Sequence, residues 1–418
     1  MPAPSEPTYS FTLPSIHDDT ALDCRIYHPL IFSQPQRRDL ANSKEWRNKG
    51  IVMAHPYAPM GGSYDDRVVG MVVEEFLKLG FVVGTFNFRG AQGSKAHTSW
   101  SGKPEIGDYM SFAAFFMHYL SYLHPFPSAS TTFTPEQSPL SGSAPMQPHD
   151  QDSPSCIPSK ESVLVILGGY SYGSHILRHL PPVPSILSPF SVPASGTAAA
   201  EILLRAHRLG DQSNLDWINA ARDHARQSHS RASLGVVMGG EETSPEKRRS
   251  SREMRRRSMD RDREGASVRR SLDLGIRIHS LSHRRGVKKD KFLETSVNST
   301  PDTGAVGSIS MPEVRYLLIS PLAAPVSTVV APGLGQKFWS REKEGKELVG
   351  KHVALAVYGD QDIFTSAKRT REWAERMGGQ PGSKFEHVEI VGAGHFWHEV
   401  GAEDKLRATL RDWEGVVS

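Results

Sequence analysis

A serine, an aspartate and a histidine follow three apolar segments in this order, and together they could perform nucleophilic catalysis. Ser171 is the centre of a Gly-Tyr-Ser-Tyr-Gly segment, Asp362 ends a Gly-Asp-Gln-Asp segment, and His395 follows Gly-Ala-Gly. A serine hydroxyl is a weak nucleophile at neutral pH and needs a base within hydrogen-bond reach. Histidine supplies that base, and a carboxylate fixes its tautomer and stabilises the imidazolium. The residue types therefore indicate acyl transfer by Ser171, with His395 as base and Asp362 as acid.

The acid has one competitor in the same segment. Asp360 lies two residues before Asp362 and follows the same apolar run. We prefer Asp362 because it lies three positions past Gly359, and we keep Asp360 as the alternative.

The residues around Ser171 favour a nucleophile elbow. An apolar run of strand length at 162–167 leads into glycines, and a helix-like segment continues to Leu180. In such an elbow the serine occupies a strained strand-to-helix turn, where glycines let neighbouring backbone pass closely. Acyl transfer also needs two N–H groups aimed at the developing negative charge. We expect one from Tyr172, directly after the nucleophile, and the other from Tyr57, in the loop after a short strand at 50–54.

Strands and helices alternate along most of the chain, which predicts an α/β fold with a mostly parallel sheet of about seven or eight strands. The loops at the carboxyl ends of parallel strands share one edge of the sheet, so Ser171, Asp362 and His395 can converge there. The expected strands span residues 9–13, 22–27, 50–54, 81–88, 162–167, 314–320, 352–358 and 385–391, and the expected helices span 66–79, 106–123, 366–377 and 402–413.

Two long segments interrupt this alternation. Residues 124–160 are rich in Pro, Ser, Thr and Gln, and we expect a disordered loop. Residues 181–311 read as a basic and largely disordered insertion, with helices expected only at 198–209 and 215–226. The single folded domain is then assembled from 1–123, from the nucleophile strand and helix at 161–180, and from 312–418.

The insertion carries the positive charge of the chain. Between Lys247 and Lys289 there are 16 Lys or Arg against five Asp or Glu, an excess of 11; since the 418-residue chain has a net charge of +3, the remainder carries −8. Ser251 and Ser258 follow paired arginines, a pattern that basophilic kinases favour, and phosphorylation would reduce the charge. Contact with a polyanion, either nucleic acid or an acidic membrane surface, is a weaker alternative, because no aromatic residues are interleaved with the arginines. We therefore identify no clear nucleic-acid or membrane partner.

The composition of the chain indicates its cellular compartment and whether it needs a metal or cofactor. The two cysteines, Cys24 and Cys156, form neither a disulfide framework nor a metal motif, which favours a reducing compartment. The N-terminus lacks a signal-peptide pattern, and no apolar run is long enough to span a membrane. We expect a cytoplasmic protein without a metal or cofactor.

The motifs together resemble the α/β-hydrolase superfamily, and more narrowly the small cap-poor dienelactone-hydrolase-like and Xaa-Pro-dipeptidyl-peptidase-like hydrolases. The resemblance covers roughly 50–123, 161–180 and 312–415. The segments that carry it are His55-Pro56, Gly61-Gly62-Ser63, Phe86-Asn87-Phe88-Arg89-Gly90 with Gly93-Ser94, Gly169–Gly173, Gly359–Asp362 and Gly392–Phe396.

The resemblance implies the same roles for Ser171, Asp362, His395 and the loop at Tyr57. The chain departs from the pattern where Tyr57-Ala58 replaces a second His-Pro, and in its two long inserts. We interpret the chain as a serine hydrolase acting on a carboxylic ester through an acyl-enzyme. The alternatives are a peptidase or amidase with the same mechanism, and a catalytically silent hydrolase fold that serves as a scaffold. This fold hosts many chemistries, so the natural substrate stays open.

Overall fold

A computed structural model describes residues 5–32, 48–125, 163–233, 309–323, 326–335 and 348–417. The chain divides into two compact units, of which the first comprises residues 1–225 and 307–418 and the second comprises residues 226–306. Of the second unit, only the end of one helix at 226–233 is described. Among the described residues, no helix is both long and apolar enough to cross a bilayer.

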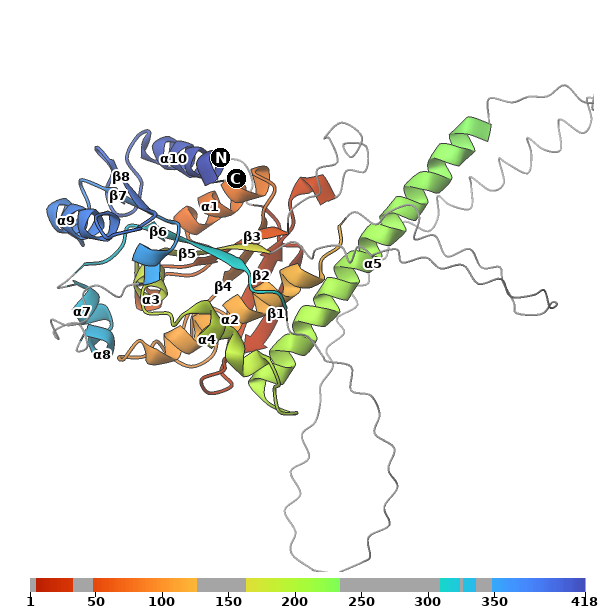
Figure 1. Cartoon of the computed structure of the whole chain (residues 1–418), viewed down its shortest axis with the longest axis horizontal. Coiled ribbons are helices and arrows are strands. Elements are labelled where there is room, and N and C mark those ends of the chain that lie inside the picture. The colour runs from red at the N-terminus through yellow and green to blue at the C-terminus, as the bar shows by residue number, and fades with distance from the viewer. Residues whose placement is uncertain are drawn as a thin grey trace, which may run out of the picture. The chain divides into compact units, whose positions relative to one another are not determined.

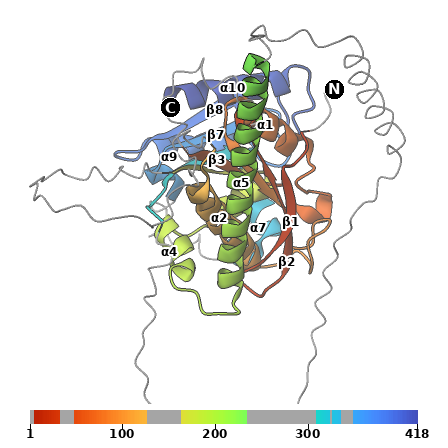
Figure 2. The ribbon, with the colours of Figure 1, turned by 90° about the vertical axis from the view of Figure 1, so that its right-hand side faces the viewer.

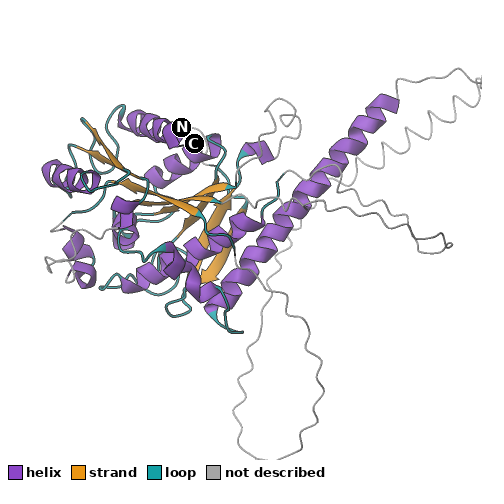
Figure 3. Cartoon of the chain, in the orientation of Figure 1, coloured by secondary structure: helices purple, strands orange, loops and turns teal. Residues whose placement is uncertain are grey.

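Eight strands form one sheet in the first unit, in the order β1-β2-β4-β3-β5-β6-β7-β8. Figure 3 shows the strands in orange, with helices around them. The β1–β2 and β2–β4 pairs are antiparallel and the other five pairs are parallel. The expectation of a mostly parallel sheet of seven or eight strands is therefore confirmed. The strands are β1 Tyr9–Pro14, β2 Ala21–Tyr27, β3 Lys49–Ala54, β4 Val82–Phe86, β5 Leu164–Tyr170, β6 Glu313–Ile319, β7 Ala354–Gly359 and β8 Phe385–Ile390.

The central strands are buried on both faces, which explains their nearly continuous apolar sequences. Successive side chains point to opposite faces of a strand, so β3 buries Ile51 and Met53 on one face and Val52 and Ala54 on the other. Helices must therefore cover the sheet on both sides.

Helices α1 (Arg67–Lys78) and α10 (Ala402–Val417) cover one face, and α2 (Lys103–Tyr122) lies on the other (Figures 1 and 2). The second face also receives α3 (Tyr172–Leu177) and α9 (Ala367–Gly378). Shorter helices are α4 Val183–Leu187, α7 Val326–Val330, α8 Pro332–Gly335 and the 3₁₀ turns η1 Leu30–Phe32, η3 Ala58–Met60, η5 Ser188–Phe190 and η6 Leu348–Lys351.

The start of the expected insertion is more ordered than the sequence indicated. The two helices expected at 198–209 and 215–226 form one continuous helix, α5 (Ala198–Ser233), which includes Gly210. A glycine inside a helix costs about 1 kcal/mol relative to alanine. Packing offsets this cost, because α5 buries apolar residues on both sides of the glycine: Ile202, Ala206 and Trp217.

Most of the segments expected to be disordered lie outside the described residues. These are 126–160 in the first segment and 234–308 in the second, which includes the candidate kinase sites Ser251 and Ser258. The described ends differ from the expectation. Residues 228–233 are helical, and the His124 N–H donates to Asn214 Oδ1 over 2.7 Å.

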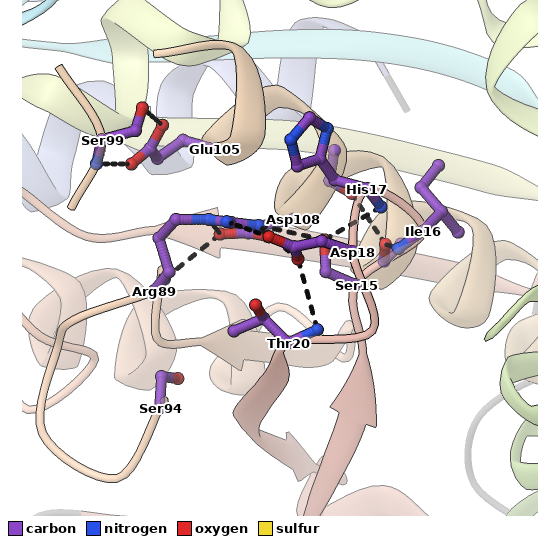
Figure 4. A network of polar contacts seen from close by, with 12 residues as sticks. Ser15, Ile16, His17, Asp18, Thr20, Arg89, Ser94, Ser99, Glu105 and Asp108 are labelled. Atoms are coloured by element: carbon purple, nitrogen blue, oxygen red, sulfur yellow. Dashed lines mark hydrogen bonds and ion pairs between the residues drawn. The ribbon is translucent and has the colours of Figure 1, made fainter. Parts of the chain in front are cut away.

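A buried ion-pair network fixes the loop after β4 (Figure 4). The guanidinium of Arg89 binds both carboxylate oxygens of Asp108 on α2, over 2.9 and 2.6 Å, and Asp18 in the β1–β2 turn over 2.8 Å. The side chains of Arg89 and Asp108 are 4% and 0% exposed. Burial lowers the pKa of Arg89, but its hydrogen bonds to Asp108 and Asp18 outweigh burial and raise it overall. The network therefore ties three elements together around one buried cation.

Replacing Asp108 with asparagine should be strongly destabilising, because Arg89 would stay buried with one of its two carboxylates gone. We expect Asp108→Asn to lower the free energy of unfolding by about 3–5 kcal/mol, measured by urea denaturation. Glu201→Gln, which breaks an exposed ion pair with Arg205 on α5, should cost less than about 0.5 kcal/mol. Equal effects of the two changes would contradict this account of the network.

Candidate active site

Ser171 sits at a sharp turn between β5 and α3. Its backbone is in the left-handed region, with φ 55° and ψ −111°, which costs of the order of 1–3 kcal/mol for a non-glycine residue. A Cβ on Gly173 would lie 2.6 Å from the Ala54 carbonyl oxygen, and one on Gly169 would lie 2.4 Å from the backbone of Gly173. Only glycine fits at either position, so the turn has the backbone geometry expected of an elbow; that Ser171 is a nucleophile stays a prediction.

The three candidate catalytic side chains form one hydrogen-bonded chain. His395 Nδ1 lies 2.6 Å from Asp362 Oδ2, and His395 Nε2 lies 2.8 Å from Ser171 Oγ. An ionised carboxylate only accepts hydrogen bonds, so Nδ1 donates to Asp362 and Nε2 of the neutral ring accepts from the serine hydroxyl. The structure thus brings the three residues into the geometry that general-base activation of a serine requires.

The two aspartates of the loop after β7 have different partners. Asp362 Oδ1 accepts from the backbone N–H groups of Phe364 and Thr365, at 2.8 and 3.0 Å, which holds Oδ2 toward the histidine. Asp360 turns away and accepts from the Gly392 N–H over 2.7 Å. The geometry therefore favours Asp362 over Asp360 as the partner of His395.

The loops that carry Asp362 and His395 touch each other closely. A Cβ on Gly359 would lie 1.9 Å from the Ala393 carbonyl oxygen, and the Gln361 N–H donates to that same oxygen over 3.0 Å. The Tyr170 hydroxyl donates to the carbonyl oxygen of His395 over 2.9 Å. These contacts thus position the loop of His395 from the loop of Asp362 on one side and from Tyr170 on the other.

The candidate oxyanion loop after β3 is held by His55. The Phe88 N–H donates to His55 Nε2 over 2.9 Å, so Nδ1 carries the proton and donates to the Pro56 carbonyl over 2.6 Å. Tyr57 follows directly, and its ring lies edge-on to the ring of Tyr172, with centroids 5.1 Å apart. The structure therefore places both residues proposed as oxyanion donors beside Ser171; their role in binding an oxyanion remains a prediction.

A pocket of about 170 Å³ opens at Ser171 and His395. Its walls are largely apolar and aromatic, and come from the loop after β3, the segment around α7 and the loops after β7 and β8. They comprise Pro56, Tyr57, Met60, Gly61, Gly62, Asp66, Tyr170, Leu322, Val326, Val330, Phe364 and Phe396. Among the described residues, no group of three or more His, Cys, Asp or Glu side chains is placed to hold a metal ion.

Three residues of the site had no role in the sequence interpretation. Tyr170 was noted only as a variable position of the Gly-x-Ser-x-Gly segment, and His55 only as part of a motif. Asp66, which lines the pocket and caps α1, was noted only at the start of an expected helix. The sequence pattern predicts the helix, but the pocket depends on loop conformations that sequence periodicity does not report.

The buried His55 should make stability depend on pH. Burial lowers the pKa of His55 to about 4, whereas an unfolded histidine titrates near about 6.5. Between these values the unfolded state binds a proton that the native state does not, so the free energy of unfolding falls as the pH falls. We expect His55 to account for about 3 kcal/mol of this loss.

Urea denaturation between pH 7.5 and 4 measures the effect. His28 and His118 have similarly lowered pKa values, so the wild type is compared with His55→Gln, in which only the His55 contribution is removed. The variant should show a shallower dependence of unfolding free energy on pH. Parallel curves would show that His55 is not buried in its neutral form.

Comparison with known proteins gives structural matches only. No protein-family model and no curated protein matches the chain. An α/β serine hydrolase homologue from Coxiella burnetii aligns over 98% of both chains with 12% identity and a TM-score of 0.42. An α/β serine hydrolase without a lid from Xanthomonas campestris aligns over 98% of this chain and 96% of its own, with 13% identity and a TM-score of 0.42.

The enzyme Est1E from Butyrivibrio proteoclasticus, solved with ferulic acid, aligns over 97% of both chains with 8% identity and a TM-score of 0.42. Since every one of these TM-scores lies below 0.5, the fold assignment depends on features of the chain itself. These are the mostly parallel eight-stranded sheet, the serine in a strained turn between β5 and α3, and the chain order Ser, Asp, His at the ends of strands. Together they identify the α/β-hydrolase fold.

Proposed function

We propose that this protein is a serine hydrolase that cleaves a carboxylic ester through an acyl-enzyme intermediate. The observation that carries the proposal is the hydrogen-bonded chain from Ser171 through His395 to Asp362, which opens into an apolar pocket. A serine that merely fills a turn does not need a histidine at 2.8 Å with a carboxylate behind it.

Each residue has a defined task in this mechanism. Ser171 Oγ attacks the ester carbonyl carbon while His395 Nε2 takes its proton, and the backbone N–H groups of Tyr57 and Tyr172 stabilise the oxyanion. His395 then gives the proton to the leaving alkoxide, which leaves an acyl group on the serine. A water molecule, deprotonated by His395, hydrolyses the acyl-enzyme. Asp362 keeps the Nδ1 proton in place throughout.

A fluorophosphonate probe tests whether Ser171 is an activated nucleophile. The probe should label the wild type and spare Ser171→Ala, because only a serine beside a general base reacts rapidly. Ser185→Ala is the control, since Ser185 is an exposed serine on α4; this variant should still be labelled. A folded wild type that resists the probe would instead support the silent scaffold.

Substitution of the two aspartates tests the assignment of the acid. Asp362→Asn should keep the fold but lower kcat by about 10⁴-fold on a p-nitrophenyl ester, because the histidine would lose the partner that fixes its tautomer. Asp360→Asn should have a mild effect, since Asp360 contacts Gly392 instead of the histidine. The opposite ranking of the two variants would overturn the assignment of Asp362.

A parallel assay with a Pro-containing dipeptide anilide separates esterase from peptidase.

A further inference from the structure

One carboxylate in the pocket has no part in the proposed chemistry. Asp66 precedes α1, and its Oδ1 accepts from the backbone N–H groups of Val68 and Val69, at 2.8 and 3.4 Å. These are the hydrogen bonds of an N-cap, and within the described residues they leave Oδ2 without a donor. The side chain also lines the pocket that contains Ser171 and His395.

The charge of Asp66 is not neutralised by an ion pair within the described part of the chain. Its two neighbours are paired elsewhere, Asp65 with Arg25 at 2.5 Å and Arg67 with Glu403 at 2.5 Å. The described residues that line the pocket include no Lys or Arg. Burial raises the pKa of Asp66 and outweighs the effects that lower it, which come from the N–H donors of Val68 and Val69 and then from His398 and His395.

The N-terminus of α1 accounts for only part of the stabilisation that a charged aspartate needs at this position. Ser or Asn would cap α1 about as well without a charge, and the helix dipole favours an anion there by only about 0.3–1 kcal/mol. Burial raises the pKa of Asp66 above its ordinary value, which shows that the surroundings disfavour the charge. A partly buried carboxylate that faces a cavity fits a ligand that brings the compensating charge.

The aromatic walls of the same pocket are independent support. Tyr57, Phe364 and Phe396 line it together with Asp66, and Phe364 and Phe396 also contact each other edge-on, with ring centroids 5.7 Å apart. Aromatic faces attract cations through their electron-rich π systems, and aromatic cages are a usual means of binding quaternary ammonium groups. A carboxylate beside aromatic rings therefore has the chemistry of an ammonium site.

We infer that Asp66 makes the pocket selective for esters that carry an ammonium group, which it holds against the aromatic walls while Ser171 attacks the carbonyl. The kinetic test of this inference rests on the proposed function, because it measures the hydrolysis of esters. The substrate class is then a cationic ester, and an isosteric neutral ester should be a poorer substrate.

Two substrates of nearly equal shape measure this selectivity. Butyrylcholine carries a trimethylammonium group, and 3,3-dimethylbutyl butyrate has a neutral tert-butyl group in its place. For the wild type, the kcat/KM ratio of the cationic to the neutral ester should be roughly tenfold or more, as expected for one charge-assisted contact. In Asp66→Asn, which keeps an oxygen acceptor for the cap, the ratio should fall close to one.

Asp65→Asn is the matched control, because it removes an equal charge one residue away that is paired with Arg25. This variant should keep the wild-type ratio, whereas a general effect of surface charge would lower both ratios alike. A wild-type ratio near one, or an unchanged ratio in Asp66→Asn, would overturn the inference.

Equilibrium binding keeps this test separate from the proposed function. Ser171→Ala cannot turn over an ester, so calorimetry can measure its affinity for butyrylcholine directly. Binding that weakens roughly tenfold or more in Ser171→Ala/Asp66→Asn supports the cation site even if the wild type hydrolyses neither ester. If Ser171→Ala binds butyrylcholine no better than the double variant, the inference fails, even where a neutral ester is hydrolysed.

Discussion

The unfavourable backbone conformation of Ser171 is the constraint on which the site depends. A non-glycine residue keeps a φ of 55° only if its surroundings hold it there, and here several contacts do so. The Ser171 N–H donates to the Ile319 carbonyl on β6 over 2.9 Å, and the Ser174 hydroxyl donates to the Ser171 carbonyl over 2.7 Å. Close passage of Gly173 along the end of β3 completes the support. The serine is thus presented by contacts from three neighbouring elements.

A second set of contacts supports the site from the edge of the sheet formed by β1 and β2. Asp18 and Asp108 fix Arg89, the backbone N–H of the preceding Phe88 binds His55, and His55 binds the carbonyl of Pro56. Three of these contacts join residues that are distant in sequence: Asp18 with Arg89, Arg89 with Asp108, and Phe88 with His55. A loss of order in the β1–β2 turn would therefore reach the loop that carries Tyr57.

The sequence predicted the parts of the site that periodicity and topology determine. Ser171, Asp362 and His395 follow parallel strands, so their convergence followed from the alternation of strands and helices alone. The choice of Asp362 over Asp360 was stated as a preference, and the hydrogen bond from Gly392 to Asp360 shows its physical basis. The continuity of α5 through Gly210 and the pocket position of Asp66 could not be predicted, because tertiary packing decides the first and loop conformation decides the second.

The hydrogen bond from Tyr170 to the backbone of His395 gives the elbow a second purpose. In the Gly-Tyr-Ser-Tyr-Gly segment, the glycines allow close passage of neighbouring backbone, and the first tyrosine holds the loop of His395. A position that varies in the Gly-x-Ser-x-Gly pattern is thus constrained here by its contact with another loop. Ser171 and His395 are therefore positioned relative to each other through one short piece of chain. A homologue in which this tyrosine is replaced would have to hold its histidine loop by other contacts. Among homologues, the tyrosine and the histidine loop are therefore expected to change together.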